Sequence, residues 1–159
     1  MTYKIKGYAC FYNYIDDGGD LIEPHALEKS TIFKNPDHVK MLYQHDVTRP
    51  IGRWTSFKQD TYGLYAEGDI YTSLDDGEMS AELLDKQIID GLSIGFITHH
   101  STLRSDNVRV LEEIEIREIS LVTFPMQNIA RTFKPQEEDN VFEHFLSSFG
   151  MTLNKETEH

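Results

Sequence analysis

Three side chains that together could hydrolyse an amide bond occur far apart in this sequence. Ser93 lies between two glycines in the stretch Asp90 to Phe96, DGLSIGF. Glycine inside a strand often marks a place where another backbone must come close, and a peptide substrate would be such a backbone. A serine hydroxyl is a weak nucleophile until a neighbouring base removes its proton. Ser93 is therefore a candidate nucleophile that requires a base.

His45 is the candidate base among the seven histidines. Imidazole titrates near neutral pH, which makes histidine the usual general base. Alternation places His45 on one face of a predicted strand with Val39, Met41 and Tyr43, where its ring would be partly buried and fixed. A core histidine satisfied by a hydrogen bond is the more common explanation for such a residue, so a second clue is needed.

That clue comes from the predicted strand between Val108 and Thr123, where alternation puts Glu118 and Ser120 on the face of Ile114 and Ile116. If that face is the core side, a buried carboxylate at Glu118 needs a partner, because burying an unpaired charge is costly. Ser120 has no adjacent glycine to admit a substrate. It is expected to be a buried strand serine rather than a rival nucleophile.

A histidine ring N–H is a natural partner for the Glu118 carboxylate. Ser93 would then attack a carbonyl, His45 would take its proton, and Glu118 would orient the imidazole and stabilise its cationic form. The alternative for Glu118 is a salt bridge with Arg117 or Lys86 on an exposed face. Periodicity alone leaves both interpretations open.

Composition limits the kinds of protein to which these residues could belong. A chain of 159 residues is long enough for one core and too short for two, so we expect a single domain. The net charge of 15 − 27 = −12 repels phosphate backbones and argues against a nucleic-acid partner. We find no apolar run long enough for a membrane span and no signal peptide, and expect a soluble, intracellular protein. The lone Cys10 is interpreted as a core thiol.

The elements that must position the three residues are mostly strands. Strands are predicted for residues 3–11, 39–45, 53–58, 63–70 and 108–123, and a further strand starts within DGLSIGF. Helices are predicted from Pro24 to Ser30 and from Asp75 to Gly91, the second with Met79, Leu83 and Ile88 on its apolar side. We expect an α+β, mostly β fold, built on an antiparallel barrel or curled sheet of about six or seven strands with two or three flanking helices.

The sequence changes character after residue 133. Residues 1–133 are predicted to form the catalytic domain, and residues 134–159 an acidic linker, an amphipathic helix and a tail. Val141, Phe142, Phe145, Leu146 and Phe149 recur at helical spacing. The sequence leaves open whether this helix packs on the domain or docks onto a partner.

Several blocks resemble, in order, the caudovirus prohead serine proteases, a family that shares its fold and catalytic plan with the herpesvirus assemblins. The blocks are GYACF from Gly7, LYQHD from Leu42 followed by PIG from Pro50, GLYAEG from Gly63, DGLSIGF from Asp90, and EISLVTFP from Glu118. By resemblance, His45 is the general base, Ser93 the nucleophile and Glu118 the third member, although assemblins place a histidine at that third position. The assemblin arginine pair that helps to bind the oxyanion has no counterpart after Pro125, and backbone N–H groups near Met126 to Asn128 are the candidate donors.

The resemblance implies a serine endopeptidase that matures a phage procapsid by cleaving the major capsid protein, the scaffold protein or itself. It would act without a cofactor, in the host cytoplasm within assembling procapsids, and would not be secreted. Its partners would be those substrate proteins, with a homo-oligomer expected by analogy and no membrane or nucleic acid. A second hypothesis is a catalytically silent capsid-assembly or scaffolding module of the same fold.

A metal hydrolase is a third hypothesis, which the sequence disfavours. His99 and His100 are adjacent, and neighbouring residues on a strand point to opposite faces, so the two rings do not readily share one ion. The acidic run from Asp16 to Asp20 fails the twelve-residue calcium-loop pattern, because the twelfth position is Leu27.

Overall fold

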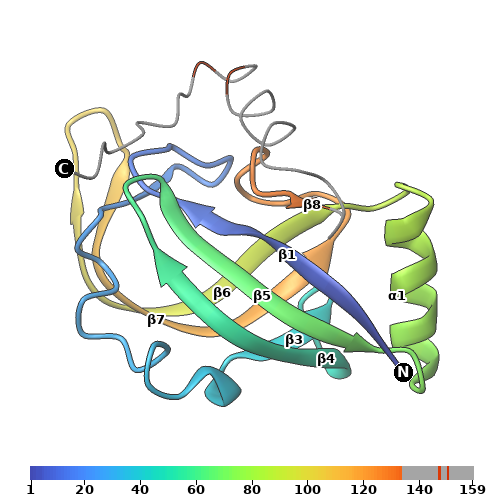
Figure 1. Cartoon of the computed structure of the whole chain (residues 1–159). Helices are drawn as coiled ribbons and strands as arrows, with labels where there is room; N and C mark the ends of the chain where they lie inside the picture. The colour runs from blue at the N-terminus through green and yellow to red at the C-terminus, as the bar shows by residue number, and fades with distance from the viewer. Residues whose placement is uncertain (134–146, 148–149, 151–159) are drawn as a thin grey trace, which may run out of the picture.

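A computed structural model describes residues 1–133, Ser147 and Gly150. One mixed sheet curls into a barrel (Figure 1). Its strands are β1 (Thr2–Phe11), β2 (Asp20–Ile22), β3 (Lys40–Tyr43), β4 (Asp46–Gln59), β5 (Gly63–Tyr71), β6 (Gly91–Leu103), β7 (Arg109–Val122) and β8 (Thr132–Phe133). The mostly β fold expected from the sequence is confirmed.

Strand β7 holds the sheet together, because it pairs with three others. The order is β2-β7-β3-β4-β5-β1-β8, and β6 also pairs with β7. Two pairings are parallel, since β2 and β3 each run alongside β7 in its own direction. The predicted hairpin of β4 and β5 and the long strand β7 are both present. The chain from residue 23 to residue 39 joins β2 to β3, two strands that both pair with β7 and not with each other.

The helices are fewer than the sequence suggested. Apart from the short 3₁₀ helix η1 (Pro36–His38), residues 1–133 contain the one helix α1 (Asp75–Asp85). The helix predicted after Pro24 is wrong, because the chain there makes successive turns with bonds such as Ala26 N–H to Glu23 O.

Helix α1 also differs in detail from the prediction. Its buried face consists of Gly77, Ser80, Ala81 and Leu84, whereas Ile88 is exposed. The helix ends at Asp85, and Gln87 then takes a left-handed backbone conformation (φ 56°), so Gly91 is free to begin β6. The apolar residues Ile88 and Ile89, which follow Asp85, made the periodic pattern look longer than the helix is.

The core fills the inside of the barrel. Trp54 is its largest fully buried side chain, and its indole N–H donates to the carbonyl of Ile119 over 3.2 Å, which ties β4 to β7 across β3. Cys10 is buried as expected, and burial raises the pKa of its thiol to about 12. A thiol with so high a pKa stays protonated and unreactive at neutral pH.

Two further sequence expectations concern membranes and the C-terminal segment. No helix among the described residues is long and apolar enough to cross a membrane. The predicted helix between Val141 and Phe149 lies, except for Ser147, outside the described residues.

Candidate active site

Glu118 and Ser120 reach the outer face of the barrel because β7 carries a bulge. Gly95 pairs with Glu118 and Phe96 with Ile116, so Arg117 is an extra residue with no partner of its own in β6. An extra residue reverses the alternation of side chains beyond it. Ile116 before the bulge points into the core, and Ile119 takes over that role after it.

The condition set by the sequence, that Glu118 faces the core with Ile114 and Ile116, is therefore not met. Glu118 lies on the opposite face from Ile119 and Leu121, and its side chain is 14% exposed. On that face, His45 and Ser120 contact its carboxylate. The need for a partner survives, because a carboxylate so little exposed is still poorly hydrated.

His45 lies in a tight turn between β3 and β4, not on the strand as predicted. Gln44 and His45 both have left-handed backbones, with φ of 55° and 58°. The Gln44 amide fixes the turn to the end of β7: its nitrogen donates to Thr123 Oγ1 over 2.6 Å, and its oxygen accepts from Thr123 N–H over 3.2 Å. Gln44 N–H also donates to Leu121 O over 2.9 Å. These bonds hold the histidine turn over Glu118.

One carboxylate and one hydroxyl hold the histidine from two sides. His45 Nδ1 is hydrogen-bonded to Glu118 Oε1, and the Ser120 hydroxyl donates to Glu118 Oε2 over 2.5 Å. The same Ser120 oxygen accepts the backbone N–H of His45 over 3.1 Å. Because a carboxylate only accepts, Nδ1 carries the proton and Nε2 keeps its lone pair. His45 is 39% exposed, so that lone pair is accessible to a reacting group.

Ser93 lies on the same face as this network. It pairs directly with Ser120 in the antiparallel β6–β7 ladder, and directly paired residues place their Cβ atoms on one face, about 4.5–5.5 Å apart. Ser93 is 4% exposed. Among the described residues its hydroxyl has no hydrogen-bond partner, so the structure brings Ser93 beside the His45–Glu118 pair without a direct bond to it.

The glycines of DGLSIGF make room for two neighbours. A Cβ on Gly95 would overlap Glu118 Oε1 and come within 2.9 Å of its Cδ, so the acid side chain lies across the glycine. A Cβ on Gly91 would approach Pro125 Cδ to 2.8 Å. Gly95 thus clears the path by which Glu118 reaches His45, a role that sequence reasoning had assigned to an approaching substrate.

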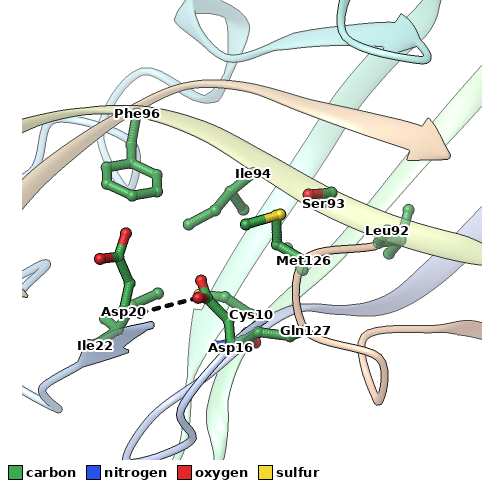
Figure 2. A pocket seen from close by; sticks show the side chains of 11 residues that line it. Cys10, Asp16, Asp20, Ile22, Leu92, Ser93, Ile94, Phe96, Met126 and Gln127 are labelled. Carbon is green, nitrogen blue, oxygen red and sulfur yellow. Dashed lines mark hydrogen bonds between the residues drawn. The ribbon is translucent and has the colours of Figure 1, made fainter. Parts of the chain in front are cut away.

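A cavity of about 70 Å³ lies on the other side of β6. Figure 2 shows Ile94 and Phe96 extending from β6 toward Met126 and Asp20. Alternation puts these two β6 side chains opposite Ser93, so the cavity lies behind the serine rather than in front of its hydroxyl. Burial raises the pKa of Asp16 at the cavity wall.

The loop that follows β7 also borders this cavity. Gln127 is buried and brackets Phe11, accepting its N–H over 2.6 Å and donating to its carbonyl over 2.9 Å. Met126 O accepts Asp17 N–H over 3.0 Å. Met126 and Gln127 are therefore fixed to the acidic turn and to β1, and both border the cavity.

Sequence reasoning missed the residues that position the site. It treated Ser120 as an inert core serine, whereas its hydroxyl contacts both the histidine and the acid. It gave Gln44 no role of its own, because this residue was considered only as part of the block LYQHD. The available signal was a hydroxyl two residues after Glu118 on one strand face, and an amide immediately before the candidate base.

No metal site is apparent in the part of the chain that the structure describes. There, no group of three or more His, Cys, Asp or Glu side chains could hold an ion. His100 instead contacts Glu112, with Nδ1 and Oε2 2.6 Å apart.

Comparisons with known proteins identify the family and the fold of this chain. The family model described as caudovirus prohead serine protease matches residues 1–143. The prohead protease of Enterobacteria phage HK97 is 30% identical over 127 residues, covering 76% of this chain and 54% of the relative. That of Escherichia phage T5 is 29% identical over 127 residues, covering 77% and 58%. The chain thus spans about half the length of the curated relatives it matches.

Solved structures show the same fold at low sequence identity. The bacteriophage T4 capsid assembly protease, gp21, has a TM-score of 0.62 and 14% identity, with 75% of this chain and 80% of that chain covered. The KSHV protease in complex with a hexapeptide phosphonate inhibitor has a TM-score of 0.55 and 13% identity, with 93% and 77% covered.

Proposed function

The chain belongs to the caudovirus prohead serine protease family, and on that premise we propose that it is a serine endopeptidase with Ser93, His45 and Glu118 as its catalytic residues. The observation that carries the proposal is the bond from His45 Nδ1 to Glu118, braced by Ser120, with Ser93 paired opposite Ser120 on the same face. In the neutral ring this bond leaves Nε2 as the basic nitrogen, and the pairing with Ser120 supports Ser93 as its partner. Such a pair of base and serine is the arrangement that acyl transfer requires.

In the proposed reaction Ser93 Oγ attacks the scissile carbonyl carbon while His45 Nε2 takes the hydroxyl proton. The proton then passes to the leaving amine as the C–N bond breaks, and an ester to Ser93 remains. Water, deprotonated by His45, hydrolyses that ester and releases the acid. Glu118 orients the ring and stabilises the imidazolium. The missing Ser93–His45 bond is compatible with this role, because catalytic hydrogen bonds often tighten only around substrate.

The negative oxygen formed during the attack needs donors close to Ser93. We assign this role to backbone N–H groups of the Met126 to Asn128 segment, which follows the end of β7 a few residues after Ser120, the residue with which Ser93 pairs. Preorganised donors of this kind stabilise the transition state without reorganisation.

The proposed substrates are the major capsid protein or scaffold protein of a phage procapsid, with cleavage inside assembling procapsids in the host. Residues 1–133 would form the catalytic domain, and residues 134–159 a linker and helix. The prohead proteases among the relatives support this role by their names. By analogy with the assemblins, we also propose that the chain forms a homo-oligomer.

Mass spectrometry of the chain co-expressed with its neighbouring capsid protein tests the proposal. Wild type should yield new termini in the capsid protein, in the scaffold or in itself, and Ser93→Ala should yield none. If both proteins give the same products, or wild type gives none, a silent capsid-assembly module becomes the better account.

A further inference from the structure

Arg117 differs from the other arginines of this chain. All six arginines lie in the described part, and five of them form a salt bridge with an aspartate: Arg49 with Asp76, Arg53 with Asp37, Arg104 with Asp106, Arg109 with Asp20, and Arg131 with Asp90. Arg117 forms no such pair with any described residue, although the chain has a net charge of −12. An exposed cation that lacks a carboxylate among so many acids is available to an external one.

The position of Arg117 points to the active site. It is the bulged residue of β7 and directly precedes Glu118. It lines an open groove of about 340 Å³ together with Thr31, His38, Lys40, Glu115 and Ile116. Lys40 pairs in register with Glu118 across β3 and β7, so the groove begins where the proposed catalytic acid lies.

The charges of the groove favour an anion at the Arg117 end. The Lys40 ammonium donates to a backbone carbonyl, Asp37 O, over 2.8 Å, a bond that does not neutralise its charge. The carboxylate of Glu115 accepts both the N–H and the hydroxyl of Thr31, the latter over 2.9 Å. These bonds orient the Glu115 carboxylate but do not neutralise it, so the groove has two cations, Arg117 and Lys40, against one carboxylate.

The spacing fits a peptide that is being cleaved. Ser93 pairs with Ser120, and Arg117 lies three residues away along β7. At about 3.3 Å per strand residue this is roughly 10 Å, or about three residues of extended peptide. An extended substrate that runs from Ser93 along the direction of β7 would therefore reach the groove two to four residues from the bond that is cleaved.

We propose that this groove is a subsite for an acidic side chain of the substrate, about two to four residues from the scissile bond. Arg117 would hold the carboxylate through its guanidinium fork, and Lys40 would add a second positive charge. The inference rests on the proposed protease function and extends it to substrate selection.

The test begins with the purified full chain and a denatured bacterial proteome, whose new termini are mapped by mass spectrometry. Cleavage sites of wild type should be enriched in Asp or Glu at one fixed position on one side of the bond. A blocked peptide built on the best site, and its Glu→Gln counterpart, are then compared. The kcat/KM ratio between them should be roughly tenfold for wild type and near one for Arg117→Ala.

Further variants separate this inference from the function on which it rests. Arg117→Glu should prefer a peptide with Lys at that position, Arg117→Lys should keep part of the acid preference, and Arg104→Ala should match wild type. Ser93-dependent cleavage without acid enrichment, or with a preference unchanged by Arg117→Ala, would overturn the subsite alone. The absence of any Ser93-dependent cleavage would overturn the protease proposal and the subsite with it.

Discussion

Two glutamates of β7 each contact a histidine, and only one of these two pairs resembles a catalytic element. His45 contacts Glu118, and His100 contacts Glu112 farther along the β6–β7 hairpin. Each glutamate also accepts a hydroxyl, from Ser120 in the first pair and from Thr102 over 3.0 Å in the second. The composition of the two clusters is thus nearly the same.

The two pairs differ in burial and in whether the hydroxyl also contacts the backbone of the histidine. The side chains of His100 and Glu112 are 65% and 33% exposed, against 39% and 14% for His45 and Glu118. Ser120 is fully buried and also accepts the His45 backbone N–H, whereas Thr102 is exposed. A histidine–carboxylate contact is therefore common surface chemistry, and it becomes a candidate site when the backbone around it is fixed and a serine shares its face.

The largest expected effect distinguishes the two histidines. His45→Ala and Ser93→Ala should each lower peptide cleavage roughly 10³-fold or more, because either change removes the base–nucleophile pair. His100→Ala is the matched control and should cleave at the wild-type rate. Steady-state cleavage of one peptide by all three variants measures this, and an equal loss for His100→Ala would remove the distinction between the pairs.

The second largest effect should be the difference in activity between variants of the two glutamates. Glu118→Gln should lose activity, but roughly 10- to 100-fold less than Ser93→Ala, because the acid orients the base rather than forming a covalent bond. Glu112→Gln should have no effect on kcat. A loss in Glu118→Gln equal to that of Ser93→Ala would count against the orienting role.

Gly95 tests whether the path of the Glu118 side chain matters. In Gly95→Ala the new methyl group overlaps the carboxylate, so the acid must move away from His45. A displacement of about 1 Å can cost on the order of 100-fold, and we expect a 10- to 100-fold fall in kcat with a melting temperature close to wild type. A variant that cleaves normally would show that the carboxylate has room to move.

The smallest effects should come from the residues that hold the turn. Thr123→Val removes the 2.6 Å bond from Gln44 but keeps the backbone contact, and we expect kcat to fall by roughly two- to fivefold. Thr98→Val, a threonine change on β6, is the matched control. A fall as large as that of Glu118→Gln would mean that the turn, rather than the acid, positions His45.

The local alternation of apolar and polar residues was enough to predict many of the strands. Strands β1, β4, β5 and β7 were predicted because alternation is a strong signal and their turns contain Gly and Asp. The two helices were predicted less well, because Pro24 and the apolar residues beyond Asp85 imitate helical signals that the surrounding contacts override. The parallel pairings of β7 could not be predicted from the sequence, since they join segments that are far apart in the chain.

Residue types and spacing were enough to select the candidates: a serine between glycines, a histidine near a strand end and an acid two residues before a second serine. The face that they occupy depends on the packed sheet, through one extra residue at Arg117, and so does the hydroxyl that contacts the histidine. The physical reason is that side-chain direction in a strand has a period of two, so a single bulge that leaves no mark in the sequence reverses every assignment beyond it.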